Sequence, residues 1–342
     1  MKTIDDLEGK VYMTCSACMS VYADGLSWAN ANTDRIVKDA ENAEHVVVLS
    51  CQVTDLAILN DLRTAERIKA ENPDKNYYVS GCLGQRTDVE LPNFLQRLET
   101  PRAAYQFLDD RTLVHFEKPF WVPNFKEKEE EKEEEQDNQI KDGHLFRNMY
   151  PLRIGKSCPN RCSYCTIRIT RGTFEQYEAQ RLEDEFLAFD DVLLVADSPT
   201  VQQVKDWHEI AVRNSKSFSI RNVEPVITTH CKDELLDLAD RGLLKAYHSP
   251  IQSADPAVLR DMSRNVPATL ETMRIAEELK GRGVYIATNI IIDYKSFNQD
   301  FSRILRLYDY VSWNPLWDNQ WNRQKAEERW QKYIVNGPPQ LK

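Results

Sequence analysis

Short runs rich in β-branched and aromatic residues recur along this chain, and stretches with the apolar spacing of amphipathic helices separate them. Such alternation predicts an α/β fold, in which crossover helices join parallel strands. In the first third of the chain the β runs lie around Val11, at 46–50 and at 77–80, and 56–70 has helical spacing. We therefore predict an α/β domain with a parallel sheet at the start of the chain.

The second half of the chain repeats the same alternation more regularly. Candidate strands lie at 152–155, 191–196, 218–222, 246–251, 285–292 and 308–313. The clearest helical segments between them are 183–188, 232–239 and 270–280. Six β/α units in succession predict an incomplete, (β/α)6 barrel.

A charged segment separates these two halves. Residues 126–135 read K-E-K-E-E-E-K-E-E-E and continue into the polar stretch 136–143. A segment with so few apolar residues cannot offset its ordering entropy by burial, so we predict a solvated linker. The predicted parts are an N-terminal α/β domain at 1–122, the acidic linker at 123–145, the barrel at 146–314, and a closing helix with a tail at 315–342.

Length and charge bound the class of protein. The 342 residues suggest two domains, and the formal net charge of -10 argues against a broad surface for nucleic acid, whose phosphates need Lys and Arg. No apolar run approaches the roughly 18 to 20 residues of a membrane span, and the N-terminus is too acidic for a signal peptide. We expect a cytoplasmic protein without a membrane partner.

Cysteine is the residue type that points to chemistry. In a reducing compartment eight cysteines indicate metal binding or catalysis rather than disulfides. Cys158, Cys162 and Cys165 form a C-x3-C-x2-C run after the first barrel strand, where three thiolates can hold three irons of a [4Fe–4S] cluster. The open fourth iron can chelate S-adenosylmethionine and deliver the electron that releases a 5′-deoxyadenosyl radical. A zinc site with His144 as fourth ligand is the alternative.

Four further cysteines lie near the ends of predicted strands in the N-terminal domain. Cys51 and Cys82 each follow a β run, and Cys15 and Cys18 follow the first one. The loops at the carboxyl ends of parallel strands form the binding crevice of such a sheet, so these positions can converge there. Cys231, at a predicted helix start, is interpreted as structural.

Several sequence islands together resemble the radical S-adenosylmethionine methylthiotransferases. This family inserts a methylthio group at an unactivated C–H bond. The islands are V-V-L-S-C-Q-V-T-D-L-A at 47–57, V-S-G-C-L-G-Q-R at 79–86, C-S-Y-C-T-I-R-I-T-R-G at 162–172 and S-P-I-Q-S-A-D-P-A-V-L-R-D-M-S-R at 249–264. The cysteine run alone indicates only the superfamily, whereas the combination is more specific.

The resemblance implies a flavodoxin-like N-terminal domain that carries a second [4Fe–4S] cluster with an open iron. Cys51 and Cys82 match two ligands, and Cys18 is preferred over Cys15 for the third because Asp24 stands at the family's acidic position six residues later. In this family one S-adenosylmethionine methylates the sulfur held at the second cluster, and another is cleaved at the barrel cluster to make the radical. The resemblance therefore implies two clusters and two molecules of S-adenosylmethionine.

Further contacts with S-adenosylmethionine are predicted on the barrel. Tyr164 can pack near the adenine or serve only in loop packing, and Glu185 can bind the amino group or be an ordinary surface residue. Arg171 can pair with the carboxylate, and Arg221 with the ribose or the carboxylate, because a buried arginine needs a polar partner. Gln252 matches the family's Q-S pair and is expected to line the top of the barrel.

The chain also departs from the family pattern. The segments I-I-I-D-Y-K-S-F at 290–297 and A-D-S-P-T at 196–200 replace the family's turns at the barrel mouth, and we expect no C-terminal β-barrel module for substrate binding. We therefore expect a peptide or protein side chain as substrate, with a tRNA adenosine as the alternative, and a reductant such as flavodoxin or ferredoxin. Two alternatives belong to other functional classes. One is a peptide-crosslinking radical enzyme whose second cluster only transfers electrons, and the other is a non-enzymatic iron–sulfur scaffold.

Overall fold

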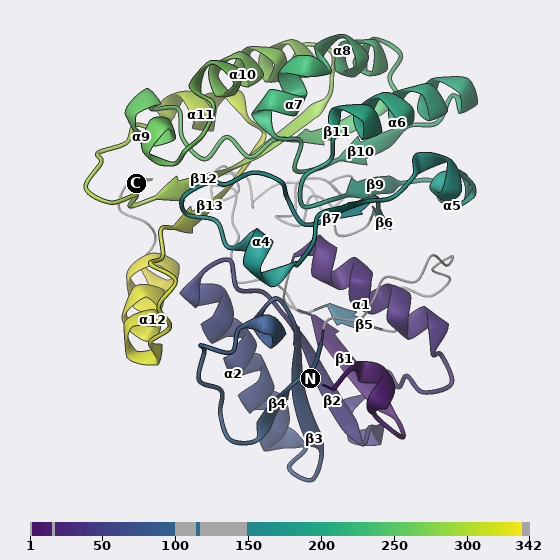
Figure 1. The fold of residues 1–342 in the computed structure, drawn as a ribbon, viewed down its shortest axis with the longest axis vertical. Helices are drawn as coiled ribbons and strands as arrows, with labels where there is room; N and C mark the ends of the chain where they lie inside the picture. Colours follow the sequence, from purple (N-terminus) through teal and green to yellow (C-terminus); the bar gives the residue numbers. More distant parts are fainter. Residues whose placement is uncertain (1, 16–17, 100–113, 117–148, 337–342) are drawn as a thin grey trace, which may run out of the picture. The chain divides into compact units, whose positions relative to one another are not determined.

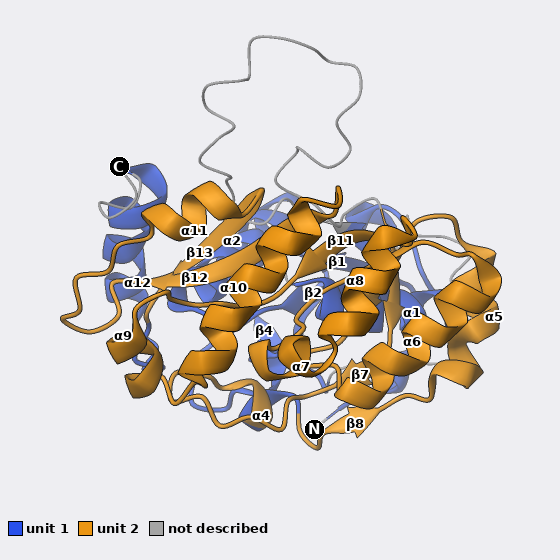
Figure 2. Cartoon of the chain, turned by 90° about the horizontal axis from the view of Figure 1, so that it is seen from above, with its two compact units in different colours: residues 1–120, 169–171, 317–338 blue, residues 121–168, 172–316, 339–342 orange. Residues whose placement is uncertain are grey.

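The computed structural model describes residues 2–15, 18–99, 114–116 and 149–336. The chain divides into two compact units, which Figure 2 colours separately and which we treat one at a time. Unit 1 comprises 1–120, 169–171 and 317–338, and unit 2 comprises 121–168, 172–316 and 339–342. The predicted linker at 123–145 lies outside the described residues. Among the helices of the described ranges, none is long and apolar enough to cross a membrane.

Unit 1 is built on a five-stranded parallel sheet. Its strands are β1 (Val11–Cys15), β2 (His45–Ser50), β3 (Asn76–Gly81), β4 (Leu95–Arg97) and β5 (Val114–Phe116). They lie in the order β4-β3-β2-β1-β5, with every neighbouring pair parallel. The predicted parallel α/β domain is thus confirmed. The order differs from the 2-1-3-4-5 of flavodoxin itself, because β1 to β4 step toward one edge and β5 joins the other side of β1.

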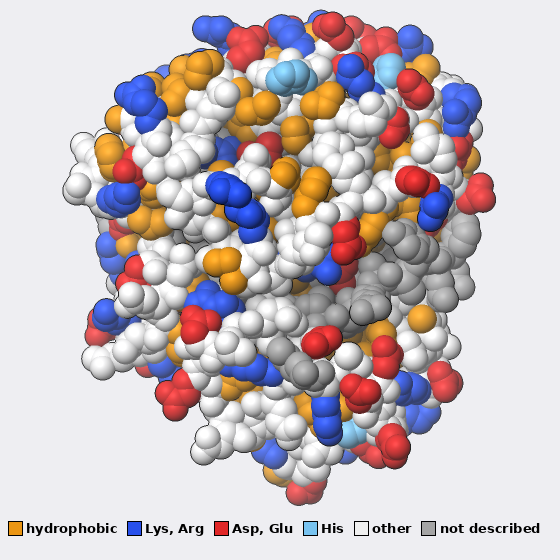
Figure 3. Space-filling model, in the orientation of Figure 1, with side chains coloured by type: hydrophobic (Ala, Val, Ile, Leu, Met, Phe, Trp, Pro, Cys, Tyr) orange, Lys and Arg blue, Asp and Glu red, His pale blue; other side chains and the backbone are white. Residues whose placement is uncertain are grey.

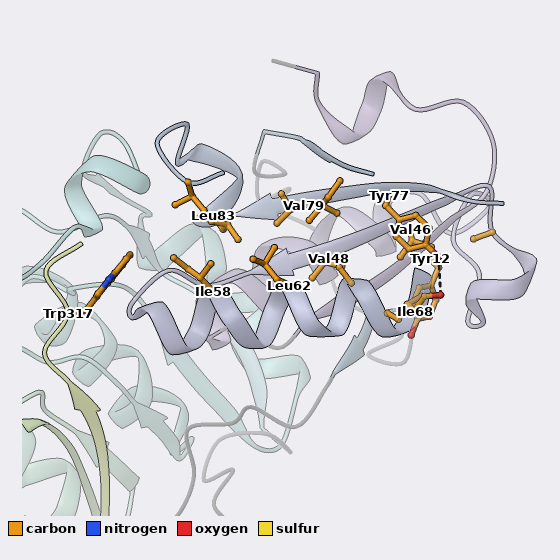
Figure 4. Packing of buried hydrophobic residues seen from close by; sticks show 14 residues of the cluster. Tyr12, Val46, Val48, Ile58, Leu62, Ile68, Tyr77, Val79, Leu83 and Trp317 are labelled. Atoms are coloured by element: carbon orange, nitrogen blue, oxygen red, sulfur yellow. Dashed lines mark hydrogen bonds between the residues drawn. The ribbon is translucent and has the colours of Figure 1, made fainter. Parts of the chain in front are cut away.

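The core of unit 1 forms between this sheet and helix α2 (Asp55–Glu71) (Figure 4). The helix begins after Thr54, whose hydroxyl accepts a hydrogen bond from the Ala57 amide at 3.1 Å. Apolar residues at helical spacing, including Ile58 and Leu62, then face the buried side chains of β2 and β3. The cap and the apolar stripe together fix where α2 starts, directly after the loop that carries Cys51. Helix α1 (Met19–Ala31) also packs against the sheet.

The C-terminal segment of the chain also belongs to unit 1. Helix α12 (Arg323–Trp330), continued by a π-helical turn at Gln331–Val335, packs against α2. Arg323 makes a two-pronged ion pair with Glu66 at 2.6 and 2.8 Å. Trp317 extends the apolar cluster, and Figure 4 shows it beyond Ile58 at one end of the core. The closing helix expected within 315–342 is therefore packed on unit 1.

Unit 2 contains six parallel strands, arranged in the order in which they occur in the chain. They are β6 (Tyr150–Arg153), β9 (Val192–Val195), β10 (Phe218–Ile220), β11 (Leu244–His248), β12 (Tyr285–Ile292) and β13 (Tyr310–Pro315). Successive strands that pair in parallel and are joined by helices make up an incomplete barrel, as the sequence predicted. A short antiparallel ribbon, β7 (Gly155–Lys156) with β8 (Glu175–Gln176), follows β6.

Helices cover the outer face of the unit 2 sheet (Figure 1). They are α5 (Glu183–Ala188), α6 (Val201–Asn214), α7 (Pro225–His230), α8 (Lys232–Asp240), α9 (Pro256–Asp261), α10 (Val266–Lys280) and α11 (Ser302–Leu307). Side-chain caps start several of them: Thr200 and Gln203 form a reciprocal capping box on α6, and Asn265 caps α10. The caps fix the points at which the loops from the carboxyl ends of the strands enter the helices. The short helix α4 (Ile167–Thr170) follows the cysteine loop.

Candidate metal centres

The three cysteines that we call the barrel triad, Cys158, Cys162 and Cys165, lie on the loop after β6 and β7 of unit 2. The loop begins at Ser157, which has a left-handed backbone with φ of 66°. The Ser157 amide donates to Asp197 Oδ2 at 2.8 Å, and its hydroxyl donates to the Gly172 carbonyl at 2.8 Å. The first cysteine is thus held at the carboxyl end of the first barrel strand, as predicted.

The barrel triad is compact. The Cys165 amide donates to the Cys162 carbonyl at 3.1 Å, and charge interactions link the thiol of Cys165 to both other cysteines. Burial raises the pKa of Cys158 to about 11 and also raises the pKa of Cys162, which the Arg264 guanidinium opposes. At neutral pH these are thiols, so binding of iron must release their protons.

A buried ion pair supports the start of the cysteine loop. Arg153, the last residue of β6, lies 3.3 Å from Asp197, which follows β9, and both side chains are less than a tenth exposed. Asp197 also accepts the Ser157 amide, so one carboxylate joins two strand ends to the loop. Neither Arg153 nor Asp197 was predicted as a site residue from the sequence. The segment A-D-S-P-T at 196–200, which departs from the family pattern, could have pointed to Asp197, because it places an acidic residue directly after a strand.

Tyr164 is partly buried against apolar side chains. It packs against the cluster that contains Val258 and Met262, and its hydroxyl accepts a hydrogen bond from Arg264 at 3.1 Å. Burial raises its pKa well above the ordinary value. The packing alternative for Tyr164 is therefore realised, and its contact with adenine stays a prediction. Arg264 was not predicted as a site residue either. It is the last residue of the island at 249–264, and that position could have pointed to it.

The other predicted barrel contacts are spread along the unit 2 sheet. Glu185 on α5 accepts a hydrogen bond from Tyr150, the first residue of β6, which lies at the opposite end of that strand from the cysteine loop. This position gives no support to a role in binding the amino group of S-adenosylmethionine. Arg221 directly follows β10, and Gln252 has a left-handed backbone with φ of 67° and pairs with β12. These two lie at the carboxyl edge, where a ligand would bind.

Unit 1 brings a second set of cysteines together, which we call the sheet triad: Cys18, Cys51 and Cys82. Cys18 precedes α1, while Cys51 and Cys82 directly follow β2 and β3. Burial raises the pKa of Cys51 far above the ordinary value, and the charges of the neighbouring Cys18 and Cys82 raise it further. The Cys82 amide donates to the carbonyl of Ser50 at 3.0 Å, which joins the two strand ends. Cys51 and Cys82 thus lie at the ends of neighbouring strands, and their convergence with Cys18 on one cluster stays a prediction.

The remaining cysteines have other surroundings. Cys15 is the last residue of β1 and is fully buried, with Leu49 and Phe116 as its partners in the sheet register. Cys231 is fully buried between α7 and α8, and burial raises its pKa to about 11. The choice of Cys18 over Cys15 as the third ligand stays a prediction.

Arg171 belongs to unit 1 although it follows the cysteine loop of the barrel in sequence. Its guanidinium lies 3.2 Å from Asp24 Oδ2 and 3.6 Å from the Sγ of Cys18. Both charged side chains are buried. The pairing of Arg171 with S-adenosylmethionine stays a prediction. In the structure, Arg171 and Asp24 form an ion pair beside Cys18 of the sheet triad.

The three thiols of neither triad converge on the position of a single metal ion. Across the described ranges, no group of three or more His, Cys, Asp or Glu side chains is arranged to hold one metal ion. A cubane cluster does not need such convergence, because each of its thiolate ligands binds a different iron. The donor set, three thiols on one loop or on adjoining loops, fits a [4Fe–4S] cluster with an open iron. His144, the fourth ligand of the zinc alternative, lies outside the described residues.

Comparison with known proteins defines the class. The family model of the Radical SAM superfamily matches residues 152–308, which include the barrel triad, all of β9, β10, β11 and β12, and part of β6. This part of the chain is a radical SAM domain. Such a domain implies one [4Fe–4S] cluster and S-adenosylmethionine.

Its sequence relatives are methylthiotransferases. The chain is 25% identical over 276 residues to a probable threonylcarbamoyladenosine tRNA methylthiotransferase of Pyrococcus horikoshii, a match that covers 75% of this chain and 63% of the relative. It is 24% identical over 315 residues to the ribosomal protein uS12 methylthiotransferase RimO of Acetivibrio thermocellus, with 82% and 66% covered. The chain thus spans less than two thirds of the length of these two relatives. The predicted kinship with the tRNA and ribosomal-protein methylthiotransferases is confirmed.

Solved structures were compared as well, and we report one of those that match. It is the radical S-adenosylmethionine methyltransferase TsrM from Kitasatospora setae; the match has a TM-score of 0.45 and 11% sequence identity and covers 82% of this chain and 67% of that one.

Proposed function

We propose that this chain is a methylthiotransferase that uses two [4Fe–4S] clusters and two molecules of S-adenosylmethionine to convert an unactivated C–H group into C–SCH3. The observation that carries the proposal is the pair of thiol triads, one at the carboxyl edge of each parallel sheet. A radical enzyme needs only the barrel triad. The sheet triad must therefore have another function, and the family relationship suggests that this function is to supply the sulfur.

The residues of the chain divide this work. The barrel triad would hold one cluster and the sheet triad the other, with Arg171 and Asp24 beside Cys18. When bound, the barrel cluster supplies the electron that cleaves S-adenosylmethionine, and the sheet cluster supplies the sulfur that is transferred. The protein contributes thiolates fixed on short loops and buried charges that hold those loops. The electron would come from a low-potential protein such as a flavodoxin or a ferredoxin.

We place the substrate among polypeptide side chains. The net charge of -10 disfavours a large phosphate-binding surface. On the face drawn in Figure 3, Lys and Arg side chains of the described residues are interspersed with Asp and Glu rather than gathered. A tRNA adenosine is the second candidate, because relatives named for tRNA and for ribosomal protein match this chain equally well.

Two matched variants test the division of labour. The full chain is reconstituted anaerobically with iron and sulfide, given S-adenosylmethionine and a reductant, and assayed for 5′-deoxyadenosine. Cys162→Ala is expected to abolish 5′-deoxyadenosine, whereas Cys51→Ala is expected to retain it and to lose only methylthio transfer. If Cys51→Ala leaves transfer unchanged, the sheet triad does not supply sulfur and the proposal is wrong.

Mass spectrometry then identifies the substrate. Peptides and RNA from host cells with and without the gene are compared for a mass gain equal to one methylthio group in place of hydrogen. The gain is expected on a peptide; a gain on RNA alone would assign the tRNA reaction. A crosslinked peptide without added sulfur, together with iron bound by both Cys15 and Cys18, would assign the crosslinking reaction instead.

A further inference from the structure

Arg264 is a buried cation beside the barrel triad. It lies between α9 and α10, and its side chain is only 3% exposed. One guanidinium nitrogen, Nη1, donates to the Tyr164 hydroxyl at 3.1 Å and lies 3.8 Å from the Sγ of Cys162. A positive charge is thus held against one of the three thiols that would bind the cluster.

The other side of the guanidinium is fixed by the sheet. Nη2 donates to Glu224 Oε2 at 2.9 Å and to the Pro250 carbonyl at 2.5 Å. Glu224 follows β10 and Pro250 follows β11, so the arginine joins the carboxyl ends of two neighbouring strands to the cysteine loop. Because a buried guanidinium without such partners would be costly, these contacts explain why the charge stays at this place.

The guanidinium still has a donor to offer. Its Nε has no hydrogen-bond partner among the residues that the structure describes. Lysine could not reproduce the arrangement, because the planar fork of arginine reaches the carboxylate, the carbonyl, the tyrosine hydroxyl and the thiol at once.

We infer that Arg264 is a positioning residue that sets the reduction potential of the iron–sulfur cluster at the barrel triad through its contact with Cys162. The inference rests on the proposed cluster at this triad. A cation that donates toward a cluster sulfur stabilises the reduced state, which carries one more negative charge, and so raises the potential. Glu224 partly offsets this charge. The pair therefore adjusts how readily an external reductant can deliver one electron.

The test measures that potential directly. Each variant is made in the full chain with the sheet triad replaced by alanine, so that only the barrel cluster contributes to the signal. Iron per chain is measured first, and the midpoint of one-electron reduction is then followed by electron paramagnetic resonance. Arg274→Gln serves as the control, because Arg274 lies on α10, is exposed and pairs only with Glu271 among the described residues.

Arg264→Gln is expected to lower the reduction equilibrium constant about tenfold, which corresponds to a fall of about 59 mV for one electron. Arg264→Lys is expected to give a smaller fall, Glu224→Gln a rise, and Arg274→Gln no change. Opposite signs for the two partners distinguish electrostatic control from simple loosening of the loop, which would shift both variants in the same direction.

Three results would overturn the inference. An unshifted midpoint in Arg264→Gln with full iron content refutes it while leaving the proposed function intact. If Arg264→Gln binds no iron, the test rests on the Glu224→Gln variant. An unchanged or lowered reduction midpoint in that variant refutes the inference. If the parent chain binds no iron at the barrel triad, both the inference and the proposed function fail.

Discussion

Gly81 offers a sharp test of how the sheet triad is built. It is the last residue of β3, has φ of +78° and directly precedes Cys82. A Cβ at this position would lie 2.5 Å from the carbonyl oxygen and 3.0 Å from the amide nitrogen of Ser50. Ser50 ends β2 and directly precedes Cys51. A side chain at 81 must therefore push apart the two strand ends that carry these cysteines.

The cost of Gly81→Ala has two parts. The left-handed backbone contributes about 1–2 kcal/mol for any residue with a Cβ. Contact with backbone atoms that cannot rotate away adds a further cost of about 1–3 kcal/mol, in the range of overpacked cores. Gly283→Ala is the matched control, because Gly283 has φ of +84° with nothing within 4 Å of the added Cβ. The control isolates the contact from the backbone strain.

The assay compares iron per chain and the thermal midpoint of both variants in a chain whose barrel triad is replaced by alanine. Gly81→Ala is expected to lose most of the iron at the sheet triad and to melt lower than Gly283→Ala, which should keep its iron. Equal iron and equal melting in the two variants would refute the argument that the close approach of Gly81 to Ser50 sets the cysteine spacing.

Three further predictions concern single residues. In a chain without the barrel triad, Cys18→Ser should remove the bound iron while Cys15→Ser retains it; the reverse result would assign Cys15 as the ligand. In the same background, Arg171→Gln should release iron to a chelator about tenfold faster, because a hydrogen bond to a charged group contributes about 1.5–3 kcal/mol; unchanged release would exclude a role for Arg171 there. Burial, aided by the charge of Arg221, lowers the pKa of His248 to about 3, so the unfolded chain takes up a proton below about pH 6.5 that the folded chain does not. Wild type should thus lose roughly 2 kcal/mol of stability between pH 7 and pH 5 from this group, and His248→Asn should lose less, as measured by denaturant unfolding at each pH.

Some regular elements were predicted with their exact bounds and others were displaced by a few residues. β12 and α5 have the predicted bounds, 285–292 and 183–188. The strand expected at 246–251 is instead Leu244–His248, because the chain leaves the sheet at Ser249 and turns through the left-handed Gln252. An apolar run shows that a segment is buried but not where its ladder of hydrogen bonds stops.

The cysteines of the site could be predicted from the sequence, whereas the contacts of the charged side chains around them could not. Spacing alone groups the barrel triad, since its members share one loop. Arg264 and Glu224 are 40 residues apart and meet only because β10 and β11 are neighbours in the sheet. Arg171 is the opposite case, because its place in the sequence suggested the barrel while its contacts lie in unit 1. Partners of a side chain depend on tertiary structure, which local pattern does not encode.

Two buried ion pairs flank the cysteine loop of unit 2, and stability alone does not explain them. Replacing such a pair by well-packed apolar residues is often neutral or stabilising, so Arg153–Asp197 and Arg264–Glu224 are poor devices for strengthening the fold. They fix the position of the cysteine loop, because Asp197 accepts a hydrogen bond from the Ser157 amide and Arg264 contacts the Cys162 thiol. A loop that must present three thiols at fixed spacing before any iron binds needs such directional constraints more than it needs a larger apolar core.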